Sequence, residues 1–297
     1  MSFRTLVRRA IDAALTGAWG AERWVAGSAL APGLAWRSTG RERVLVLAPH
    51  PDDEVAGCGA TLTLHRRAGD QITICYITDG RRSRSAGLDG DAMARRRHAE
   101  ARESAATLGA RFEWVGLREG EWVPGDLVAP LDRLMNETQP TMIYAPSRVD
   151  FHPEHYKVAL AAAEVLRRPT RPRNLEVRVY QVQVPLTRAL VNLVTPGLPV
   201  LNEMRHLSAI YGSQEGSLRA CLRLRQYAAR AHHLPGIAEE FWAIPASSYA
   251  ALHAEEPPRP LVETFRGLRR LPWTDPLAFR VGAAERRRLA RLAVPSS

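Results

Sequence analysis

Short apolar runs alternate with helical stretches across nearly half of this chain, between residues 43 and 185. Such alternation is typical of a mostly parallel sheet with helices on both faces and right-handed crossovers between its strands. The sequence therefore predicts an α/β, Rossmann-like fold. The expected strands are 43–48, 71–78, 111–115, 141–145 and 176–184, and the expected helices between them are 57–67, 92–108, 127–137 and 155–166.

The rest of the chain has a different pattern. Beyond Pro185 it becomes helical, with helices expected near 200–212, 217–230 and 236–242. At 297 residues the chain is long enough to bury a sizeable core. We expect three parts, namely a helical N-terminal extension over 1–40, one large domain over 41–250, and a Pro/Arg-rich C-terminal extension over 251–297 with a basic helix around 282–293.

Charged and imidazole side chains crowd the end of the first expected strand. The apolar run is followed by Ala-Pro and then by His50, Asp52, Asp53 and Glu54. An isolated pair of aspartates is usually a solvated turn or a helix cap. So much negative charge beside a buried strand, however, is unfavourable unless a positive group offsets it. A divalent metal ion is the natural candidate.

A second cluster follows the strand expected over 141–145, again after an Ala-Pro step. It contains His152, Glu154 and His155 and leads into a helix. In open α/β sheets, ligands gather at the carboxyl ends of the strands. Because both clusters lie at such ends, we expect them to meet in space.

The residue types indicate the chemistry of the site. Three protein ligands and one open position describe a catalytic zinc, and two histidines with one carboxylate fit that description. Of Asp52 and Asp53, one can coordinate while the other takes a proton from the attacking water. A remaining histidine can polarise a carbonyl or protonate a leaving amine. The same ligands also accept Fe(II), Co(II) or Ni(II).

The two clusters together resemble the PIG-L (LmbE-like) family of zinc-dependent N-deacetylases, which remove acetyl groups from N-acetylglucosamine units. The similarity rests on the strings Ala48–Glu54 and His152–His155 and extends over roughly residues 43–245. Weaker landmarks of the same family are Ile77-Thr78-Asp79-Gly80, Arg97-His98-Ala99-Glu100, Tyr211-Gly212-Ser213-Gln214 and Ile237-Ala238-Glu239-Glu240-Phe241.

The resemblance implies a role for each residue of the two clusters. His50, Asp53 and His155 would bind one Zn²⁺ per chain, Asp52 would be the general base, and His152 would stabilise the oxyanion or act as an acid. Two further assignments concern substrate: Arg97 would approach the sugar, and Asp79 would bind a sugar hydroxyl or support the metal site.

Two positions depart from the family pattern. Glu154 stands where many relatives carry Asp, which affects how the neighbouring histidines are oriented. The segment Arg81-Arg82-Ser83-Arg84-Ser85 is more basic than the family leads one to expect. Its arginines either recognise a phosphate or carboxylate of the substrate or are simply solvated.

The formal net charge of +10 favours anionic partners, namely nucleic acid, anionic lipid or a phosphorylated substrate. We do not expect nucleic acid, since the chain has neither a binding motif for it nor an interleaved aromatic stripe. Arginine excess can also reflect genome composition alone. The helical spacing of Phe3, Leu6, Val7, Ile11 and Leu15 predicts an amphipathic helix, which packs on its own domain or lies on a membrane surface; we favour packing.

The three cysteines are far apart in sequence, and no disulfide is expected. The absence of an expected disulfide fits a reducing cytoplasm, with peripheral attachment to the inner membrane surface as the alternative. The N-terminal segment is not typical of a secretory signal, and no stretch approaches a membrane span. The oligomeric state is left open. The predicted function is zinc-dependent N-deacetylation of an amino-sugar small molecule or glycolipid; the alternatives are an amidase acting on a larger amide of a sugar-linked thiol conjugate and a non-catalytic binder at an anionic membrane.

Overall fold

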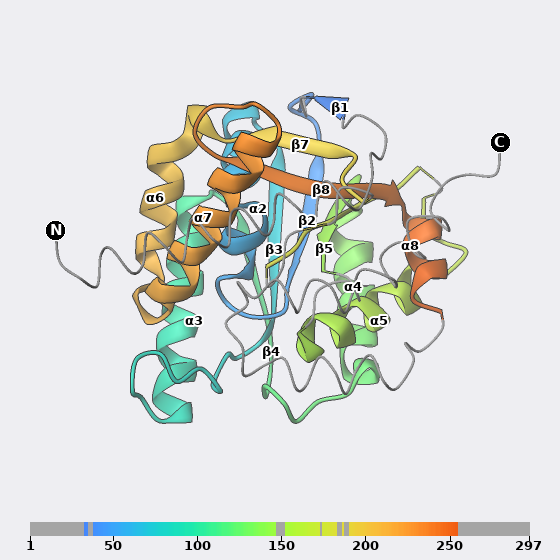
Figure 1. Ribbon diagram of the computed structural model, residues 1–297. Coiled ribbons are helices and arrows are strands. Elements are labelled where there is room, and N and C mark those ends of the chain that lie inside the picture. Colours follow the sequence, from blue (N-terminus) through green and yellow to red (C-terminus); the bar gives the residue numbers. More distant parts are fainter. Residues whose placement is uncertain are drawn as a thin grey trace, which may run out of the picture.

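The computed structural model describes residues 33–34, 38–146, 152–172, 174–182, 186 and 190–254. Within these residues, eight strands form one sheet in the order β1-β7-β8-β6-β5-β2-β3-β4 (Figure 1). The strands are β1 (Gly33–Leu34), β2 (Arg43–Ala48), β3 (Gln71–Thr78), β4 (Arg111–Leu117), β5 (Met142–Ala145), β6 (Glu176–Val179), β7 (Leu193–Pro196) and β8 (Ala238–Pro245).

Strand β2 lies at the centre of the parallel part of the sheet, with strands on both sides of it. It pairs in parallel with β3 on one side and with β5 on the other, and β4 and β6 extend these pairs, also in parallel. The strand β8 then runs antiparallel to both β6 and β7. The order of the parallel strands therefore reverses between β2 and β5, and a reversal of this kind opens a crevice at the carboxyl ends of the two strands.

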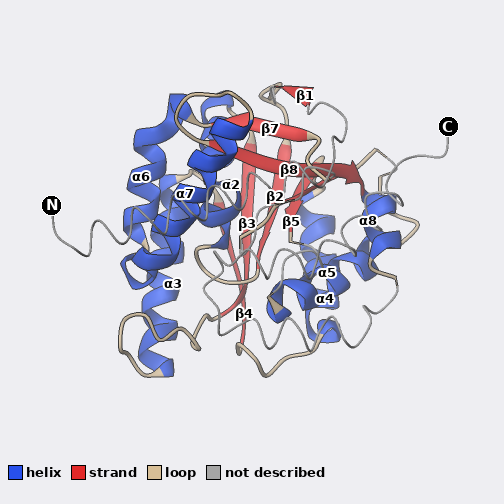
Figure 2. Ribbon diagram, viewed as in Figure 1, coloured by secondary structure: helices blue, strands red, loops and turns tan. Residues whose placement is uncertain are grey.

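Helices cover both faces of the sheet (Figure 2). One face carries α4 (Pro124–Thr138), α5 (Pro153–Leu166) and α8 (Ala246–Leu252); the other carries α2 (Asp53–Ala68), α3 (Gly90–Thr107), α6 (Leu201–Ile210) and α7 (Glu215–Ala231). Short 3₁₀ turns, η1 (Leu198–Val200) and η2 (Gly212–Gln214), precede α6 and α7. Among the described residues, no helix has the length and apolar character needed to cross a bilayer.

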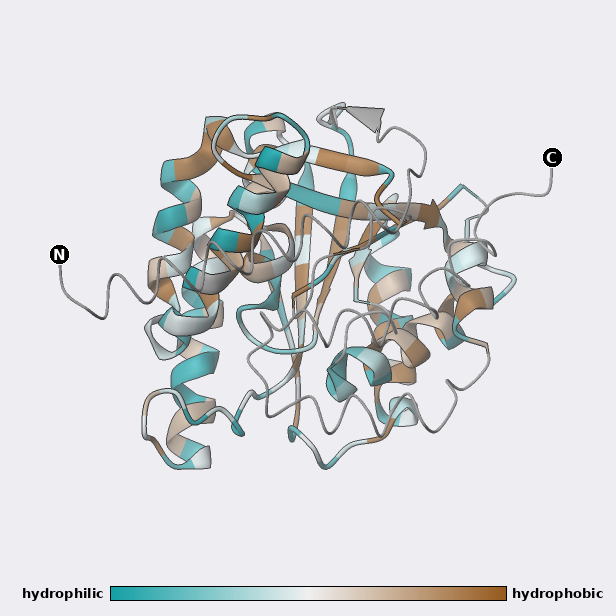
Figure 3. Cartoon of the chain, in the orientation of Figure 1, coloured by the Kyte–Doolittle hydropathy of each residue, from teal (hydrophilic) through white to brown (hydrophobic). Residues whose placement is uncertain are grey.

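The core is divided between the two faces by the alternation of side chains along the strands. On β2, Leu45 and Leu47 pack toward α4 and α5, whereas Val44 and Val46 pack toward α2 and α3. A strand that is apolar on both faces is buried on both faces, as expected for the centre of a parallel sheet. In Figure 3 hydrophobic residues accordingly mark strands such as β7, whereas much of α3 is hydrophilic.

The predicted α/β fold is confirmed, with a correction in its last third. The helix expected over 236–242 is wrong, because that segment forms strand β8. Its residues alternate between the two cores, with Ile237 and Phe241 on the α2 side and Trp242 and Ile244 on the α5 side. This period of two is that of a strand. The adjacent acidic residues Glu239 and Glu240 interrupt the apolar pattern, so the alternation was not recognised in the sequence.

Other boundaries differ by smaller amounts. Helix α2 begins at Asp53, earlier than the expected residue 57, and the strand expected over 176–184 ends as β6 at Val179. Strand β7 and helix α8 were not expected. The helices predicted near the N-terminus and around 282–293 lie outside the described residues, so the three-part division of the chain stays a prediction.

Candidate active site

The two predicted clusters meet at the crevice between β2 and β5. His50 follows β2, and His152 and His155 lie at the start of α5, in the connection that leaves β5. Each of the three imidazoles offers a ring nitrogen, and these atoms all lie within 4.8 Å of one another. The ring centroids of His50 and His152 are 4.6 Å apart, and those of His152 and His155 are 5.0 Å apart. The parallel sheet thus brings the clusters together as expected.

The carboxylate of Asp53 lies between two of these imidazoles. Its Oδ2 atom is 3.1 Å from His50 Nδ1 and 3.1 Å from His155 Nε2, and it also accepts the backbone amide of His50 at 2.7 Å. Burial would raise the pKa of Asp53, but the neighbouring His155 and His50 outweigh burial and hold it well below its usual range. The carboxylate is therefore kept ionised among nitrogen donors.

Three imidazoles and an ionised carboxylate are a donor set that suits zinc. The ligand set predicted from the sequence was His50, Asp53 and His155, whereas the group whose ring nitrogens lie within 4.8 Å of one another is His50, His152 and His155. The two sets share His50 and His155 and differ only in whether Asp53 or His152 completes them. The residues present thus fit a metal ion of this kind on either assignment.

Hydrogen bonding distinguishes His152 from the other two histidines. His152 is the N-cap residue of α5, and its Nδ1 accepts the backbone amide of Glu154 at 3.2 Å. A neutral imidazole whose Nδ1 accepts a hydrogen bond carries its proton on Nε2. The Nδ1 atom of His152 is thereby engaged with the backbone at the start of α5.

Asp52 has a different set of partners from its neighbour Asp53. Its backbone φ is 117°, a conformation that residues other than glycine rarely adopt, and its side chain is buried. Arg97 Nη2 donates to Asp52 Oδ1 at 2.6 Å and also to the carbonyl of Pro51. The unusual backbone is thus held by a buried guanidinium. Burial raises the pKa of Asp52 to about 7, against the opposing charge of Arg97.

Glu54 connects the turn that contains Asp52 and Asp53 to neighbouring elements of the fold. It is fully buried, accepts hydrogen bonds from Ser104 Oγ at 2.7 Å and Tyr211 Oη at 2.6 Å, and receives the backbone amide of Asp52 at 3.2 Å. Burial raises the pKa of Glu54, and the two hydroxyl donors oppose that rise. Glu54 therefore ties the turn to α3 and to the segment before α7.

Glu119 is a site residue that sequence reasoning missed. Its Oε1 atom lies 3.6 Å from His50 Nε2, on the side of the ring opposite Asp53. Burial disfavours both charges, yet the pair lowers the pKa of Glu119 to about 2, and together with Asp53 it raises the pKa of His50 to about 9. Glu119 follows β4, so its position at a strand end on the same edge of the sheet was the available signal.

Asp79 does not line the active-site cavity. Its Oδ2 accepts from Arg81 Nε at 2.7 Å, and its Oδ1 accepts the backbone amides of Arg81 and Glu119, both at 3.2 Å. Through Glu119 this carboxylate is connected to His50. The structure therefore places Asp79 where it can support the site, and its contact with a sugar hydroxyl stays a prediction.

Glu154, the residue that departs from the family pattern, points away from the histidines. It accepts hydrogen bonds from the indole of Trp122 and, at 3.2 Å, from Lys157. The longer side chain is thereby anchored on the segment before α4. Its backbone amide still reaches His152, so the cap of α5 is retained.

A cavity of about 530 Å³ opens over this group of residues. Its lining includes Arg97 and, from the basic loop, Arg82 and Arg84. The loop is fastened to the N-terminal end of α7, where the side-chain amide of Gln214 donates to the hydroxyls of Ser83 and Ser85 at 2.8 and 3.0 Å. The full lining comprises His50, Asp52, Asp53, Gly80, Arg82, Ser83, Arg84, Arg97, Glu119, His152, Val182, Gln214 and Ser217.

Solved structures of similar fold include three enzymes of known name. An N,N'-diacetylchitobiose deacetylase from Pyrococcus horikoshii is 21% identical, with a TM-score of 0.60 over 69% of this chain and 85% of that one. A 4-carboxy-2-hydroxymuconate hydratase from Pseudomonas putida KT2440 is 18% identical, with a TM-score of 0.60 over 68% and 95%. The zinc-inhibited form of a teicoplanin deacetylase is 19% identical, with a TM-score of 0.52 over 68% and 98%. At these identities the likeness is one of fold.

The family comparison agrees with the resemblance found in the sequence. Residues 45–166 match the model of the PIG-L family, described as GlcNAc-PI de-N-acetylase. This span runs from β2 to the end of α5 and contains the whole imidazole and carboxylate group. The chain therefore contains a PIG-L domain.

Proposed function

We propose that this protein is a metal-dependent hydrolase that removes the N-acetyl group from an amino-sugar substrate, releasing acetate and a free amine. The observation that carries the proposal is the convergence of three imidazoles and the Asp53 carboxylate, with a second carboxylate, Asp52, beside them. The PIG-L match and the deacetylases among the structures of similar fold support it.

We assign the metal to His50, Asp53 and His155. Asp53 contacts two of the histidines, His50 and His155, whereas Nδ1 of His152 already accepts the backbone amide of Glu154. A zinc ion held there would act as a Lewis acid toward the amide carbonyl and the attacking water. The carboxylates of Asp53 and Glu119 lie on either side of the His50 ring and fix its orientation at the proposed metal site.

Asp52 is proposed as the general base. Its carboxylate faces the cavity beside the metal ligands, accepts the proton of the attacking water, and returns a proton to the nitrogen of the departing amine. Arg97 holds one oxygen of this carboxylate at 2.6 Å and is itself buried. A base fixed in this way keeps its second oxygen available for the proton transfer.

His152 is proposed to stabilise the oxyanion. With Nδ1 accepting the Glu154 amide, Nε2 can donate a hydrogen bond to the carbonyl oxygen as negative charge develops there. The backbone cap of α5 thus fixes the ring and selects its tautomer together. This role differs from metal binding and can be separated from it by substitution.

The proposal is tested by measuring metal content and acetate release on one preparation. We expect about one zinc per chain and acetate release from some members of a panel of N-acetylglucosamine derivatives. Treatment with a chelator should abolish release, and re-addition of zinc should restore it. Zinc without acetate from any member would contradict deacetylation and direct attention to larger amides of the same sugars. Absence of bound metal after reconstitution would contradict the proposed site itself.

We propose that the part of the substrate attached to the amino sugar is anionic. Arg82 and Arg84 line the cavity and are exposed, and neither forms an ion pair with any described residue. Other arginines nearby are already paired, namely Arg81 with Asp79 and Arg97 with Asp52. Two guanidinium groups that line the cavity and pair with no carboxylate among the described residues favour a phosphate or a carboxylate on the substrate.

Replacing both Arg82 and Arg84 with Ala should therefore weaken turnover of charged substrates selectively. We expect kcat/KM for a phosphorylated N-acetylglucosamine derivative to fall at least about tenfold further than kcat/KM for its neutral counterpart. The matched control is Arg118→Ala, which removes an exposed arginine paired with Glu121 outside the cavity lining. An equal fall for both substrates would contradict the proposed anionic part of the substrate.

A further inference from the structure

Helix α2 is broken immediately behind the proposed metal-binding turn. Cys58 has φ −146° and ψ 20°, which is not helical, so the first turn and the rest of α2 are two helical pieces. Glycine flanks the break on both sides because neighbours approach closely there. A Cβ atom on Gly57 would overlap the ring of Tyr180, and one on Gly59 would meet the sulfur of Met204.

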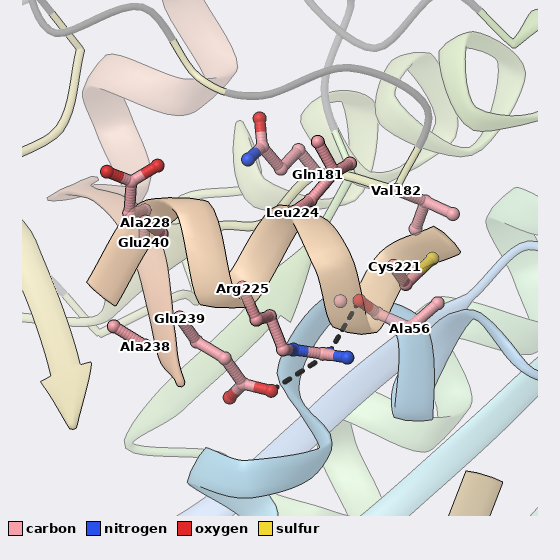
Figure 4. Close-up of a pocket in the computed structure, with 11 residues that line it drawn as sticks. Ala56, Gln181, Val182, Cys221, Leu224, Arg225, Ala228, Ala238, Glu239 and Glu240 are labelled. Carbon is pink, nitrogen blue, oxygen red and sulfur yellow. Dashed lines mark hydrogen bonds and ion pairs between the residues drawn. The ribbon is translucent and has the colours of Figure 1, made fainter. Parts of the chain in front are cut away.

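A buried ion pair from two distant elements binds both sides of this break. Arg225 of α7 places Nη2 2.6 Å from the carbonyl of Ala56 and 2.8 Å from Glu239 Oε1 of β8 (Figure 4). The same Nη2 atom lies 2.6 Å from the carbonyl of Val55. In an unbroken helix such carbonyls accept hydrogen bonds from amides four residues further on. Here a guanidinium satisfies them at the end of the first piece.

Glu239 satisfies the beginning of the second piece. Its Oε1 accepts the backbone amide of Ala60 at 2.9 Å, and its Oε2 accepts the backbone amide and the hydroxyl of Thr61 at 2.8 and 2.7 Å. A carboxylate that accepts the first amides of a helix acts as an N-cap, a role normally filled by a residue of the same helix. The cap of this piece comes instead from β8.

Both members of the pair are removed from solvent. Arg225 is 5% exposed and Glu239 is 2% exposed. Buried charges of this kind are tolerated only when every polar atom is well paired, and replacing one partner leaves the other charge uncompensated. The ion pair between Arg225 and Glu239, which we call the α2 clasp, is therefore a rigid connection between α7, β8 and the two pieces of α2.

We propose that the α2 clasp positions the first turn of α2 and thereby aims Asp53 at His50 and His155. Asp53 lies in that turn, two residues before Val55, whose carbonyl Arg225 holds. Because of the break, the axis of the first turn need not follow the axis of the second helical piece. The α2 clasp fixes the orientation of the first turn relative to that second piece. Arg225 and Glu239 are thus positioning residues for metal binding. This inference rests on the proposed role of Asp53 as a metal ligand.

The test compares zinc affinity in clasp variants with a matched control. Arg225→Lys retains one charge but replaces the planar guanidinium with a compact ammonium on a flexible stem, which does not reproduce the geometry of the guanidinium contacts. Glu239→Gln removes the charge while keeping an acceptor. Starting from the zinc-loaded protein, the Kd for zinc is measured by competition with a chelator. We expect zinc binding to weaken about 10- to 100-fold in both variants, with kcat lowered and KM little changed.

The control is Arg178→Lys. Arg178 is 7% exposed and pairs with Glu176 and the Tyr144 hydroxyl, away from the break in α2. Its replacement should lower Tm as the clasp variants do, with the Kd for zinc unchanged. If the clasp variants lower Tm but retain the wild-type Kd for zinc, the clasp stabilises the fold alone and the inference is overturned.

Thr61→Val keeps the inference testable if the charge variants do not fold. This change removes only the hydroxyl bond to Glu239 Oε2, with nearly the same side-chain shape. We expect about fivefold weaker zinc binding, the magnitude of one lost hydrogen bond, and an unchanged Kd would overturn the inference. Failure of the proposed function is distinguishable, because then the wild-type protein itself would bind no zinc or release no acetate.

Discussion

Replacement of Asp52 with Asn is expected to lower kcat about 10³-fold while leaving one zinc bound per chain. The amide oxygen of Asn can still accept the hydrogen bond from Arg97, so the strained backbone at this position keeps its anchor. The amide cannot take a proton from water, so the loss should fall on kcat with little change in KM. Because Asp53 carries its own contacts to His50 and His155, metal binding should persist.

The measurement is single-substrate kinetics together with metal analysis on the same preparation. Asp91→Asn serves as the control, since Asp91 is an exposed carboxylate that pairs with Arg81 outside the cavity lining. Its turnover should match that of the wild type. Near-normal turnover by the Asp52→Asn variant would show that another group is the base.

Replacement of His155 with Ala is the second change with a large expected effect. His155 is fully buried and lies 3.1 Å from the Asp53 carboxylate, so its loss removes a metal ligand from the centre of the group. We expect stoichiometric zinc binding to be lost and activity to fall by at least about 10³-fold, because Lewis-acid stabilisation is worth several kcal/mol. Asp53→Ala should behave in the same way.

His152→Ala separates the two possible ligand sets. If His50, Asp53 and His155 hold the metal, the His152 variant keeps its zinc and loses only oxyanion stabilisation, about 10²- to 10³-fold in kcat. If the three histidines hold it, the His152 variant loses zinc and the Asp53 variant keeps it. Zinc content of the three variants, measured side by side, therefore decides between the sets, and retention of zinc by His155→Ala would contradict both.

Much of the site was predictable because its key residues stand beside signals that are local in sequence. His50, Asp52 and Asp53 directly follow an apolar run, and His152 and His155 open a helical stretch after another. The rule that ligands collect at the carboxyl ends of parallel strands then suffices to bring the two clusters together. The structure bears this out at the reversal of strand order between β2 and β5.

The residues that sequence reasoning missed or misplaced act through partners distant in the chain. Glu119 matters because β4 ends near His50, and no spacing in the sequence links the two. Segment 238–245 contains two adjacent glutamates and looked helical, yet it is a buried strand. Glu239 is accommodated there because Arg225 and the amides of α2 satisfy it. Sequence reasoning can place a charged residue in the core only when the residue that pairs with it is known.

The sequence by itself determined the α/β fold, because apolar periodicity is a property of neighbouring residues. Its local motifs also carried the resemblance to the PIG-L family and predicted which residues would bind a metal ion. Only the tertiary structure decided which partner each of these residues has. It placed Arg97 against Asp52, Glu119 and Asp53 on either side of His50, and Arg225 with Glu239 at the break in α2. Hydrogen bonds and ion pairs act over a few ångströms, so their partners are set by packing and not by distance along the chain.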